Sequence, residues 1–214
     1  MTAAVAAVDA RGDVPFQCPT CGAEIPLRHV GVALYVCPFC HATCAVAEGG
    51  LAPGDVRAAL LEPEGAFEVG AHGTLSSVLG GGPFEVAGRA RYDADEGGWE
   101  EWLLILEGGR WAVAECSEGS WLLFTERHVA APTRPARQVG DRLELAGHSI
   151  LVNEVGRARL AAGRGGLSAP FAAGQSFDFA VGTSEHRVAK VAVDGRRSLL
   201  SLGRPADADD FELG

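Results

Sequence analysis

Four cysteines near the N-terminus have the types and spacing that most clearly predict chemistry in this chain. Cys18 and Cys21 are separated by two residues, as are Cys37 and Cys40, and fifteen residues lie between the two pairs. Two thiolates spaced in this way can face one ion from a single tight turn, and two such turns supply a closed tetrahedron of sulfur ligands. The spacing therefore predicts a structural zinc site, with one Zn²⁺ held by a zinc ribbon over residues 16–48.

Three other chemistries fit parts of this pattern. The segment Cys37-Pro-Phe-Cys40-His41 matches a haem-attachment motif, but that chemistry requires export and leaves the upstream cysteine pair unexplained. Four thiolates can also hold iron, whereas zinc is the usual ion of a short ribbon. A Cys-x-x-Cys redox motif normally lies beside a βαβ unit, which this sequence does not predict. Zinc is therefore the preferred interpretation, because it accounts for both pairs and is the usual ion of a short ribbon.

The roles of three further residues stay open. His41 and Cys44 lie beside the second cysteine pair, and either is able to replace one of the four ligands. We expect His41 to lie at the surface or behind the ligands, and Cys44 to be a small buried apolar residue. Cys116 ends an apolar segment, so we expect it to be a buried, inert thiol.

A second group combines tryptophans with carboxylates. Four tryptophans occur within residues 99–121, and acidic residues lie among them. Such side chains suit core packing and hairpin pairing, and that is the simpler interpretation. The alternative is a ligand or partner surface that attracts a cation such as a polyamine or a basic peptide. The candidate residues for this surface are Trp99, Glu100, Glu101, Trp102 and Trp121.

The rest of the chain contains no recognised catalytic motif. Nucleophile elbows, phosphate-binding loops and paired-histidine metal motifs are all missing from the sequence, and we lean against an enzyme. The histidines at 72, 128, 148 and 186 are scattered, which predicts surface or hydrogen-bonded side chains. Nucleic acid is an unlikely partner, because Arg28 is the sole basic residue in the predicted ribbon and phosphate binding there would be weak.

Charge and hydropathy favour a cytoplasmic protein that does not span a membrane. The formal net charge is −10, with acidic residues concentrated in 91–126 and at the C-terminal end, and basic residues in 133–204. The simpler interpretation is that these are solvated faces, and the alternative is contact between the acidic and basic parts. No apolar run approaches the roughly 20 residues that span a bilayer. The first residues are a poor signal peptide, so we expect reduced thiols.

The remaining sequence predicts a mainly β protein. From residue 67 onward, short apolar segments alternate with glycine-rich turns, and few stretches keep helical periodicity. Gly108-Gly109 and Asp194-Gly195 are hairpin signals, and residues 99–125 predict a three-stranded meander. The expected organisation is a flexible N-terminus (1–15), the zinc ribbon (16–48), a linker with a short helix at 55–61 (49–66), a first β half (67–132), a second β half (133–203) and an acidic tail (204–214).

An internal repeat relates the two β halves. Val69-Gly70 begins a stretch that ends near Gly88, and Val139-Gly140 begins a similar stretch that ends near Gly156. The copies are offset by 70 residues at the first glycine and by 68 at the second. Two copies are too few for a solenoid, so the repeat predicts a duplicated antiparallel β sandwich or a barrel-like domain.

The β region also resembles a bacterial family, domain of unknown function 4178. Phe84-Glu85-Val86-Ala87-Gly88-Arg89 followed by Trp99-Glu100-Glu101-Trp102 is similar to the family's pattern, as are the segments around Trp121 and Phe177-Asp178-Phe179. The resemblance covers most of residues 67–200, and family members often carry a cysteine-rich ribbon in front. The chain departs from the family at Gly165-Gly166-Leu167-Ser168-Ala169-Pro170, which lacks a glutamate common there. The resemblance implies no established activity, and it implies a link to envelope-stress or polyamine-related gene clusters.

Together these features predict a non-catalytic zinc-ribbon β protein that binds another protein, as an adaptor or interaction module. The alternative is a protein that binds a small ligand, a polyamine or a basic peptide, through the acidic tryptophan-rich half. An enzyme whose site is assembled from scattered residues is the third hypothesis. A pocket lined by tryptophans and carboxylates would favour the ligand, and an exposed apolar patch with an open sheet edge would favour the protein partner.

Overall fold

The computed structural model of the chain is mainly β. It describes residues 14–27, 31–47, 50–52, 65–131, 134–136 and 138–214. These residues form sixteen strands and three short 3-10 turns. The predicted linker helix at 55–61 and most of the N-terminal segment lie outside the described residues. The mainly β fold class predicted from the alternating apolar segments is confirmed.

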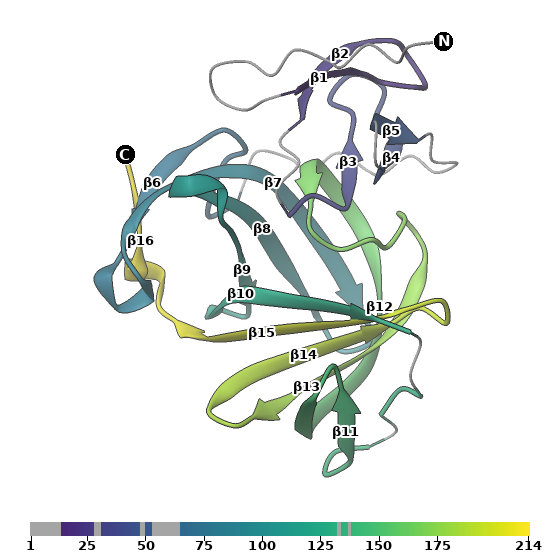
Figure 1. Ribbon diagram of the computed structural model, residues 1–214, viewed down its shortest axis with the longest axis vertical. Coiled ribbons are helices and arrows are strands. Elements are labelled where there is room, and N and C mark those ends of the chain that lie inside the picture. Colours follow the sequence, from purple (N-terminus) through teal and green to yellow (C-terminus); the bar gives the residue numbers. More distant parts are fainter. Residues whose placement is uncertain (1–13, 28–30, 48–49, 53–64, 132–133, 137) are drawn as a thin grey trace.

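Eight strands close into an antiparallel barrel (Figure 1). In order around the barrel they are β7 (Gly82–Ala94), β8 (Gly98–Leu106), β9 (Trp111–Ser117), β10 (Ser120–Ala130), β15 (Ser198–Ala206), β14 (Arg187–Val193), β13 (Ser176–Ser184) and β12 (His148–Leu167). The ring closes because β12 pairs with β7 as well as with β13. Closure pairs both edges of every barrel strand and decides between the barrel and the sandwich.

The barrel consists of two halves of the same design. Strands β7–β10 form one half and β12–β15 the other, and the seams pair β7 with β12 and β10 with β15. Each half begins with a short arm, β6 (His72–Leu75) against β7 and β11 (Arg142–Leu145) against β12. One seam therefore joins the first strands of the two halves, and the other seam joins their last strands. This is the arrangement that a two-fold relation between the halves requires.

Backbone hydrogen bonds align the two copies. Gly70 donates to the Val86 carbonyl at 2.8 Å, and Gly140 donates to the Val152 carbonyl at 2.8 Å. The φ angles of the two glycines are 91° and 90°, a conformation that favours glycine. The first glycines of the repeat are thus equivalent. The predicted offset of 68 residues at the second glycine was wrong, because Val86 aligns with Val152. The offset changes along the repeat because the turn after β6 is longer than the turn after β11.

The predicted turns are confirmed. Gly108 and Gly109, with φ of 74° and 75°, connect β8 to β9, and Gly195, with φ of 80°, lies between β14 and β15. A tight turn at Glu118-Gly119 connects β9 to β10, which completes the meander predicted over residues 99–125. Positive φ at these positions lets the short turns match the twist of the strands.

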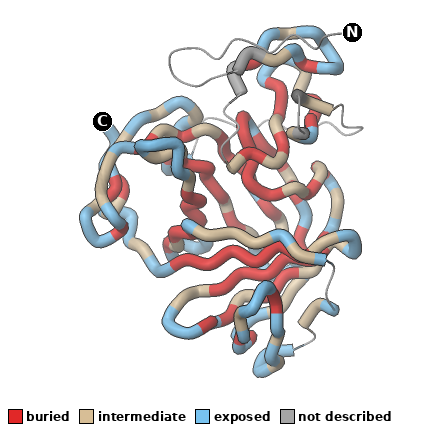
Figure 2. The backbone as a smooth tube through the Cα atoms, viewed as in Figure 1, coloured by how far each residue is buried: buried red, intermediate tan, exposed pale blue. Residues whose placement is uncertain are grey.

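Each arm covers an apolar cluster on the outside of the barrel. On the first half the cluster is aromatic, and it includes Phe67, Phe84, Trp102, Trp121 and Phe211. On the second half it is aliphatic, and it includes Leu145, Ile150, Val191, Leu200 and Leu202. Figure 2 shows the resulting pattern, with buried barrel strands and exposed turns at the ends of the hairpins.

The acidic C-terminal segment is part of this outer layer. β16 (Phe211–Leu213) pairs with β6 of the first half, and Phe211 is buried in the aromatic cluster. Asp210 accepts a hydrogen bond of 2.5 Å from Ser76. In the segment predicted as an acidic tail (204–214), β15 extends to Ala206 and the chain then returns to the first half.

The cysteine module is a set of short strands at one end of the barrel (Figure 1). It contains β1 (Val14–Gln17), β2 (Glu24–Leu27), β3 (Leu34–Val36), β4 (Thr43–Ala47) and β5 (Gly50–Ala52). β2 pairs with β1, and β3 pairs with β4, so each cysteine pair lies between two paired strands. Because β5 pairs with β4, the module extends into the segment predicted as a linker.

The module is joined to the barrel by backbone pairing and by apolar contacts. β3 pairs with the end of β12, where Tyr35 lies opposite Gly166. Val32 is buried in a cluster with the barrel residues Leu103, Val113 and Phe124, and side chains from β3, β4 and β5 pack against it. The module therefore closes one end of the barrel interior.

Candidate metal centre and charged barrel interior

The four predicted cysteines converge on one point. Their sulfur atoms all lie within 4.8 Å of one another. The Sγ atoms of Cys18 and Cys40 are 3.7 Å apart, and those of Cys21 and Cys37 are 3.8 Å apart. A tetrahedral ion with bonds of about 2.3 Å to sulfur has sulfur–sulfur edges of about 3.8 Å. The two measured distances match opposite edges of such a tetrahedron, so the donor set fits a single ion.

Local structure presents the sulfurs in the same way at both pairs. The first pair connects β1 to β2 and the second connects β3 to β4. The amide of Cys18 donates to the Ala23 carbonyl at 2.8 Å, and that of Cys37 donates to the Ala42 carbonyl at 3.0 Å. Each turn thus ends an antiparallel strand pair and directs two thiols to the same side.

Backbone amides also hydrogen-bond the sulfurs. The amides of Thr20 and Cys21 donate to the Cys18 sulfur. The amides two and three residues after Cys37 make the equivalent bonds in the second turn. Burial disfavours the Cys18 thiolate, but these hydrogen bonds outweigh that effect and lower the pKa of Cys18 to about 6. The first turn therefore favours the thiolate of Cys18, the form of cysteine that ligates metals. Burial raises the pKa of Cys37 despite its equivalent hydrogen bonds, and the pKa values of Cys21 and Cys40 are raised as well.

His41 and Cys44 lie outside the ligand set. His41 has a φ of 61° and takes the position that Gly22, with φ of 76°, has after the first pair. His41 thus adopts the left-handed backbone conformation that this turn requires. Cys44 is fully buried, burial raises its pKa to about 12, and its Sγ approaches the Ala42 carbonyl at 3.8 Å. Cys116, on the barrel strand β9, is half-buried and distant in the fold from this centre.

The residues of the predicted tryptophan and carboxylate surface lie on two opposite faces of the barrel wall. Trp102 and Trp121 are buried in the outer aromatic cluster, where their rings stack with centroids 5.3 Å apart. Trp99 and Glu101 are buried on the other side, and the Trp99 indole donates to Glu101 at 3.0 Å. Glu100 is partly exposed and accepts two hydrogen bonds from Arg89. These five residues do not form one surface, because side chains alternate along a strand.

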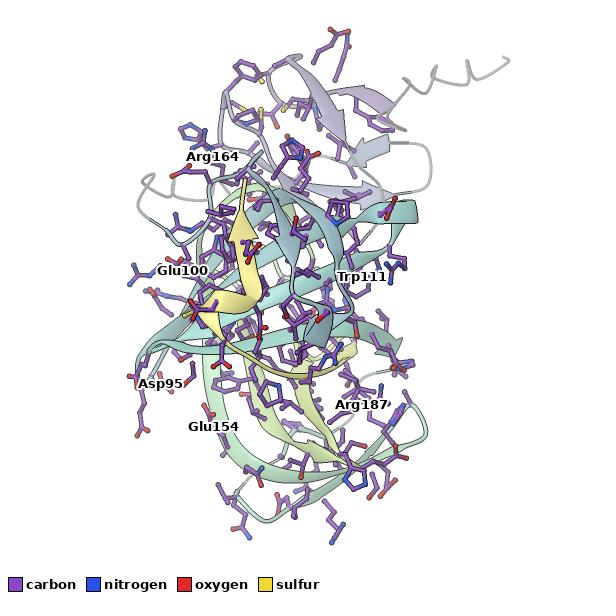
Figure 3. All side chains as sticks on the ribbon, turned by 90° about the vertical axis from the view of Figure 1, so that its left-hand side faces the viewer. Asp95, Glu100, Trp111, Glu154, Arg164 and Arg187 are labelled. Atoms are coloured by element: carbon purple, nitrogen blue, oxygen red, sulfur yellow. The ribbon has the colours of Figure 1, made fainter. Side chains whose placement is uncertain are left out.

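A surface hollow of about 570 Å³ lies at the end of the β7–β8 hairpin. It is lined by edges of Trp99 and Trp102, by Glu100 and Glu118, and by Arg91. Figure 3 shows Glu100 pointing away from the barrel on this side. The tryptophans contribute little area, since their exposed fractions are 8% and 2%, and Arg91 opposes a cationic ligand.

The barrel interior contains a charged network that the sequence did not predict. Glu101 and Glu115 lie directly opposite each other on β8 and β9, an arrangement that is unfavourable for like charges. Lys190 enters from β14 across the barrel, and its Nζ lies 2.5 Å from Glu115 and 3.6 Å from Glu101. The same Nζ lies 3.6 Å from the centre of the Trp99 ring. Lys190 is the single lysine of the chain and contacts both buried glutamates, and the buried Arg127 guanidinium interacts electrostatically with the same two carboxyls.

Burial has a marked effect on one of these carboxyls. It raises the pKa of Glu115 to about 7, with the Glu101 charge acting in the same direction and Lys190 opposing it. Beside the network, Arg127 donates to the Ser168 carbonyl at 2.6 Å and to the Ser201 hydroxyl at 3.3 Å. The cavity among these residues measures about 20 Å³, which is room for about one water molecule. The interior is thus filled by side chains.

A second group of metal-ligating types also comes together in the structure. The ligand atoms of Glu126, His128 and His148 lie within 4.8 Å of one another. The histidines were predicted to be surface or hydrogen-bonded residues, and His128 is hydrogen-bonded to Glu126 at 2.6 Å; the sequence did not indicate that His148 lies beside it. They are twenty residues apart and lie in different halves, so only the pairing of β10 with β15 and the position of the β11–β12 arm bring them together.

The comparisons with known proteins add no relative. No family model matches the chain, and neither the curated proteins nor the solved structures give a match. The resemblance to domain of unknown function 4178 therefore stays a prediction. Among the described residues, no helix is long and apolar enough to cross a membrane.

Proposed function

We propose that the chain binds one Zn²⁺ ion through Cys18, Cys21, Cys37 and Cys40, and that the ion folds a module that closes the barrel and binds another protein. The convergence of the four sulfurs carries this proposal, because two sulfur–sulfur distances of 3.7 and 3.8 Å match a tetrahedral site. Zinc is the expected ion for four thiolates in a closed structural site. The ion is structural, and no catalytic role is assigned to it.

The composition of the module supports a need for the ion. Among its buried apolar residues are Cys18, Ile25, Cys37, Ala42 and Cys44, so most of its small core is cysteine. A core of this size contributes little hydrophobic stabilisation, and structural zinc sites contribute their folding free energy directly. The remaining support comes from the barrel through β12 and the Val32 cluster.

Two exposed features of the module support a protein partner. Phe39 lies in the second cysteine turn with 67% of its surface exposed. β5 pairs with β4 on one side and is the last strand of the sheet. Within the described ranges, no strand pairs with the other edge of β5. Exposed aromatic residues and unpaired strand edges are features that partner chains use for anchoring and strand addition. The cavity beside Lys190 and Arg127 in the barrel interior, by contrast, measures about 20 Å³ and holds about one water molecule.

The metal part of this function is tested by native mass spectrometry of the full chain before and after chelator treatment. We expect one zinc per chain, lost together with the fold of the module when Cys18 or Cys37 is replaced by serine. A chain that carries no metal and keeps an ordered module would contradict the proposal. The cysteines would then have to serve redox chemistry.

The partner part is tested by placing a photo-crosslinking residue at Phe39 and, as a matched control, at Val139, which is 62% exposed on the second half. We expect a discrete adduct in cells from position 39 alone. Equal adducts at both positions, or none at position 39, would argue against an interaction surface on the module. Thiolate ligands must stay reduced, so the proposal places the chain in the cytoplasm.

A small ligand is the second candidate function. The hollow of about 570 Å³ beside Trp99, Glu100 and Glu118 supports it, since pockets that combine aromatic rings and carboxylates suit polyamines or basic peptides. Isothermal titration with spermidine distinguishes the two candidates. Binding that is lost in Glu118→Gln would favour the ligand, and absence of binding would leave the protein-interaction module.

A further inference from the structure

A β-bulge on β10 changes which side chains face outward. The register between β10 and β15 shifts between Phe124 and Glu126, so Thr125 is an extra residue. Before the bulge, Phe124 packs into the interior cluster. After it, Arg127 lines the interior cavity, which places its neighbours Glu126 and His128 on the outer face. Bulges often re-aim side chains beside functional sites.

The arm of the second half brings another histidine to this face. Ala146 and Gly147, with φ of 53° and 82°, form the tight turn between β11 and β12. His148 is the first residue of β12, directly after this turn. Its ring centroid lies 5.4 Å from that of His128. Two histidines from different halves of the molecule thus face each other.

A carboxylate completes the group. Glu126 Oε1 lies 2.6 Å from His128 Nε2, and the other oxygen of Glu126 accepts a hydrogen bond from Arg187 on β14. The three ligand atoms lie within 4.8 Å of one another, and all three side chains are half-buried. Arg187 fixes the orientation of the carboxylate and leaves Oε1 directed at the imidazoles. Figure 3 shows Arg187 on the barrel, farther from the module than Trp111.

We propose that Glu126, His128 and His148 form a second metal site, which binds a divalent zinc ion with its fourth position open. Two imidazoles and one carboxylate are the protein ligands of many zinc sites that keep a water molecule. Bonds of about 2.1 Å require ligand atoms about 3.4 Å apart, which small side-chain rotations achieve from the observed positions. The ion ties the β11–β12 arm to β10 across the two halves.

This site differs in chemistry from the four-cysteine centre. Nitrogen and oxygen ligands suit Zn²⁺, Co²⁺ and Ni²⁺, and an open site exchanges its ion more readily than a closed thiolate site. The two sites therefore respond to different variants and have different cobalt spectra. A thiolate site gives a sulfur-to-cobalt charge-transfer band, which the second site lacks.

The test is a titration of the full chain with Zn²⁺ and, separately, with Co²⁺, followed by native mass spectrometry and absorption spectroscopy. We expect a second ion per chain in the wild type, and the second cobalt adds no charge-transfer intensity. His128→Ala and His148→Ala each remove the second ion and keep the first. Cys37→Ser does the reverse. His72→Ala, on the arm of the first half, is the matched control and keeps both ions.

A single ion per chain at tenfold excess of metal would overturn the proposal, as would a second ion that survives in His128→Ala and His148→Ala. Glu126→Gln gives an independent readout, because it keeps the hydrogen-bonding shape and removes the charge. We expect affinity for the second ion to fall by about tenfold or more, in line with losses on changing groups that support a metal. Unchanged affinity in this variant would exclude Glu126 as a ligand.

Discussion

The cysteine module and the barrel both bring acidic side chains close together, and the two regions differ in the source of the positive charge that compensates them. The module gathers four thiols, and as thiolates they require a cation from outside the chain. The barrel gathers Glu101 and Glu115 on adjacent strands, and Lys190 from the opposite side compensates them. On the proposed function, the module depends on the supply of an ion, whereas the barrel carries its own positive charges.

The two regions also differ in what holds their backbones. Every barrel strand has a hydrogen-bonded neighbour on both sides, and apolar clusters line the interior and both outer faces. The strands of the module have three to five residues, and its small core is mostly cysteine. We therefore expect closure of the sheet and apolar burial to stabilise the barrel. We expect a metal ion bound by the cysteines, and the attachment to β12, to stabilise the module.

The largest expected effect is the loss of the module without loss of the barrel. Cys37→Ser removes one ligand, and zinc sites of this kind contribute about 10 kcal/mol or more to folding. We expect hydrogen exchange in β3 and β4 to become fast while β9 and β14 stay protected. Cys44→Ala is the control, and we expect it to keep the metal. Simultaneous loss of protection in both regions would show that the barrel depends on the ion as well.

Removal of the internal counter-charge should weaken the barrel by a smaller amount. Lys190→Met removes the cation that contacts both buried glutamates and leaves Arg127 as the remaining buried cation near them. Breaking a buried ion pair in this way costs about 3–5 kcal/mol. Denaturant unfolding of the zinc-loaded protein measures the loss. The double variant Lys190→Met with Glu115→Gln should recover part of the stability. No recovery would mean that the packing of Lys190, and not its charge, matters.

The barrel seam should tolerate added volume poorly at one position. A Cβ at Gly88 would lie 1.9 Å from the Gly166 carbonyl oxygen, so Gly88→Ala forces β7 and β12 apart. Such crowding costs about 1–3 kcal/mol. Gly163→Ala on the same seam meets only side-chain atoms, at 3.0 Å or more, and should cost less. Equal thermal unfolding temperatures for the two variants would contradict this account of the seam.

The smallest expected effect is a pH dependence. The pKa of Glu115 is about 7 in the folded protein against an ordinary value of 4.5, so the folded state holds this proton more tightly. Its contribution to stability is full below about pH 4.5 and is lost as the pH rises through about 7. Glu115→Gln should flatten the pH profile of unfolding over that range. Glu107→Gln, in the exposed β8–β9 turn, should leave the profile as in the wild type.

The sequence predicted the local features of this protein well. The Cys-x-x-Cys spacing located the four sulfurs, and glycine pairs located the turns at Gly108-Gly109 and Asp194-Gly195, because both signals act within a few residues. The repeat predicted two β halves and left sandwich or barrel open. The offset at the second glycine failed, because turn lengths differ between the arms.

Features that require contacts across the fold were not predicted. Trp99 and Trp102 were assigned to one surface, and strand alternation places them on opposite sides of β8. Phe211 was assigned to a tail, and pairing with β6 buries it. The bulge at Thr125 decides which way Glu126 and His128 face, and nothing in the adjacent residues indicates it.

The mainly β class, the turns, the duplication and the cluster of four cysteines that could hold a metal ion all follow from the sequence. Each of these depends on spacing along the chain, where a few bonds fix the geometry. Only the tertiary structure decided that the strands close into a barrel, that Lys190 lies between Glu101 and Glu115, and that His148 meets His128. These depend on register between distant strands, and a shift of one residue would send each side chain to the opposite face.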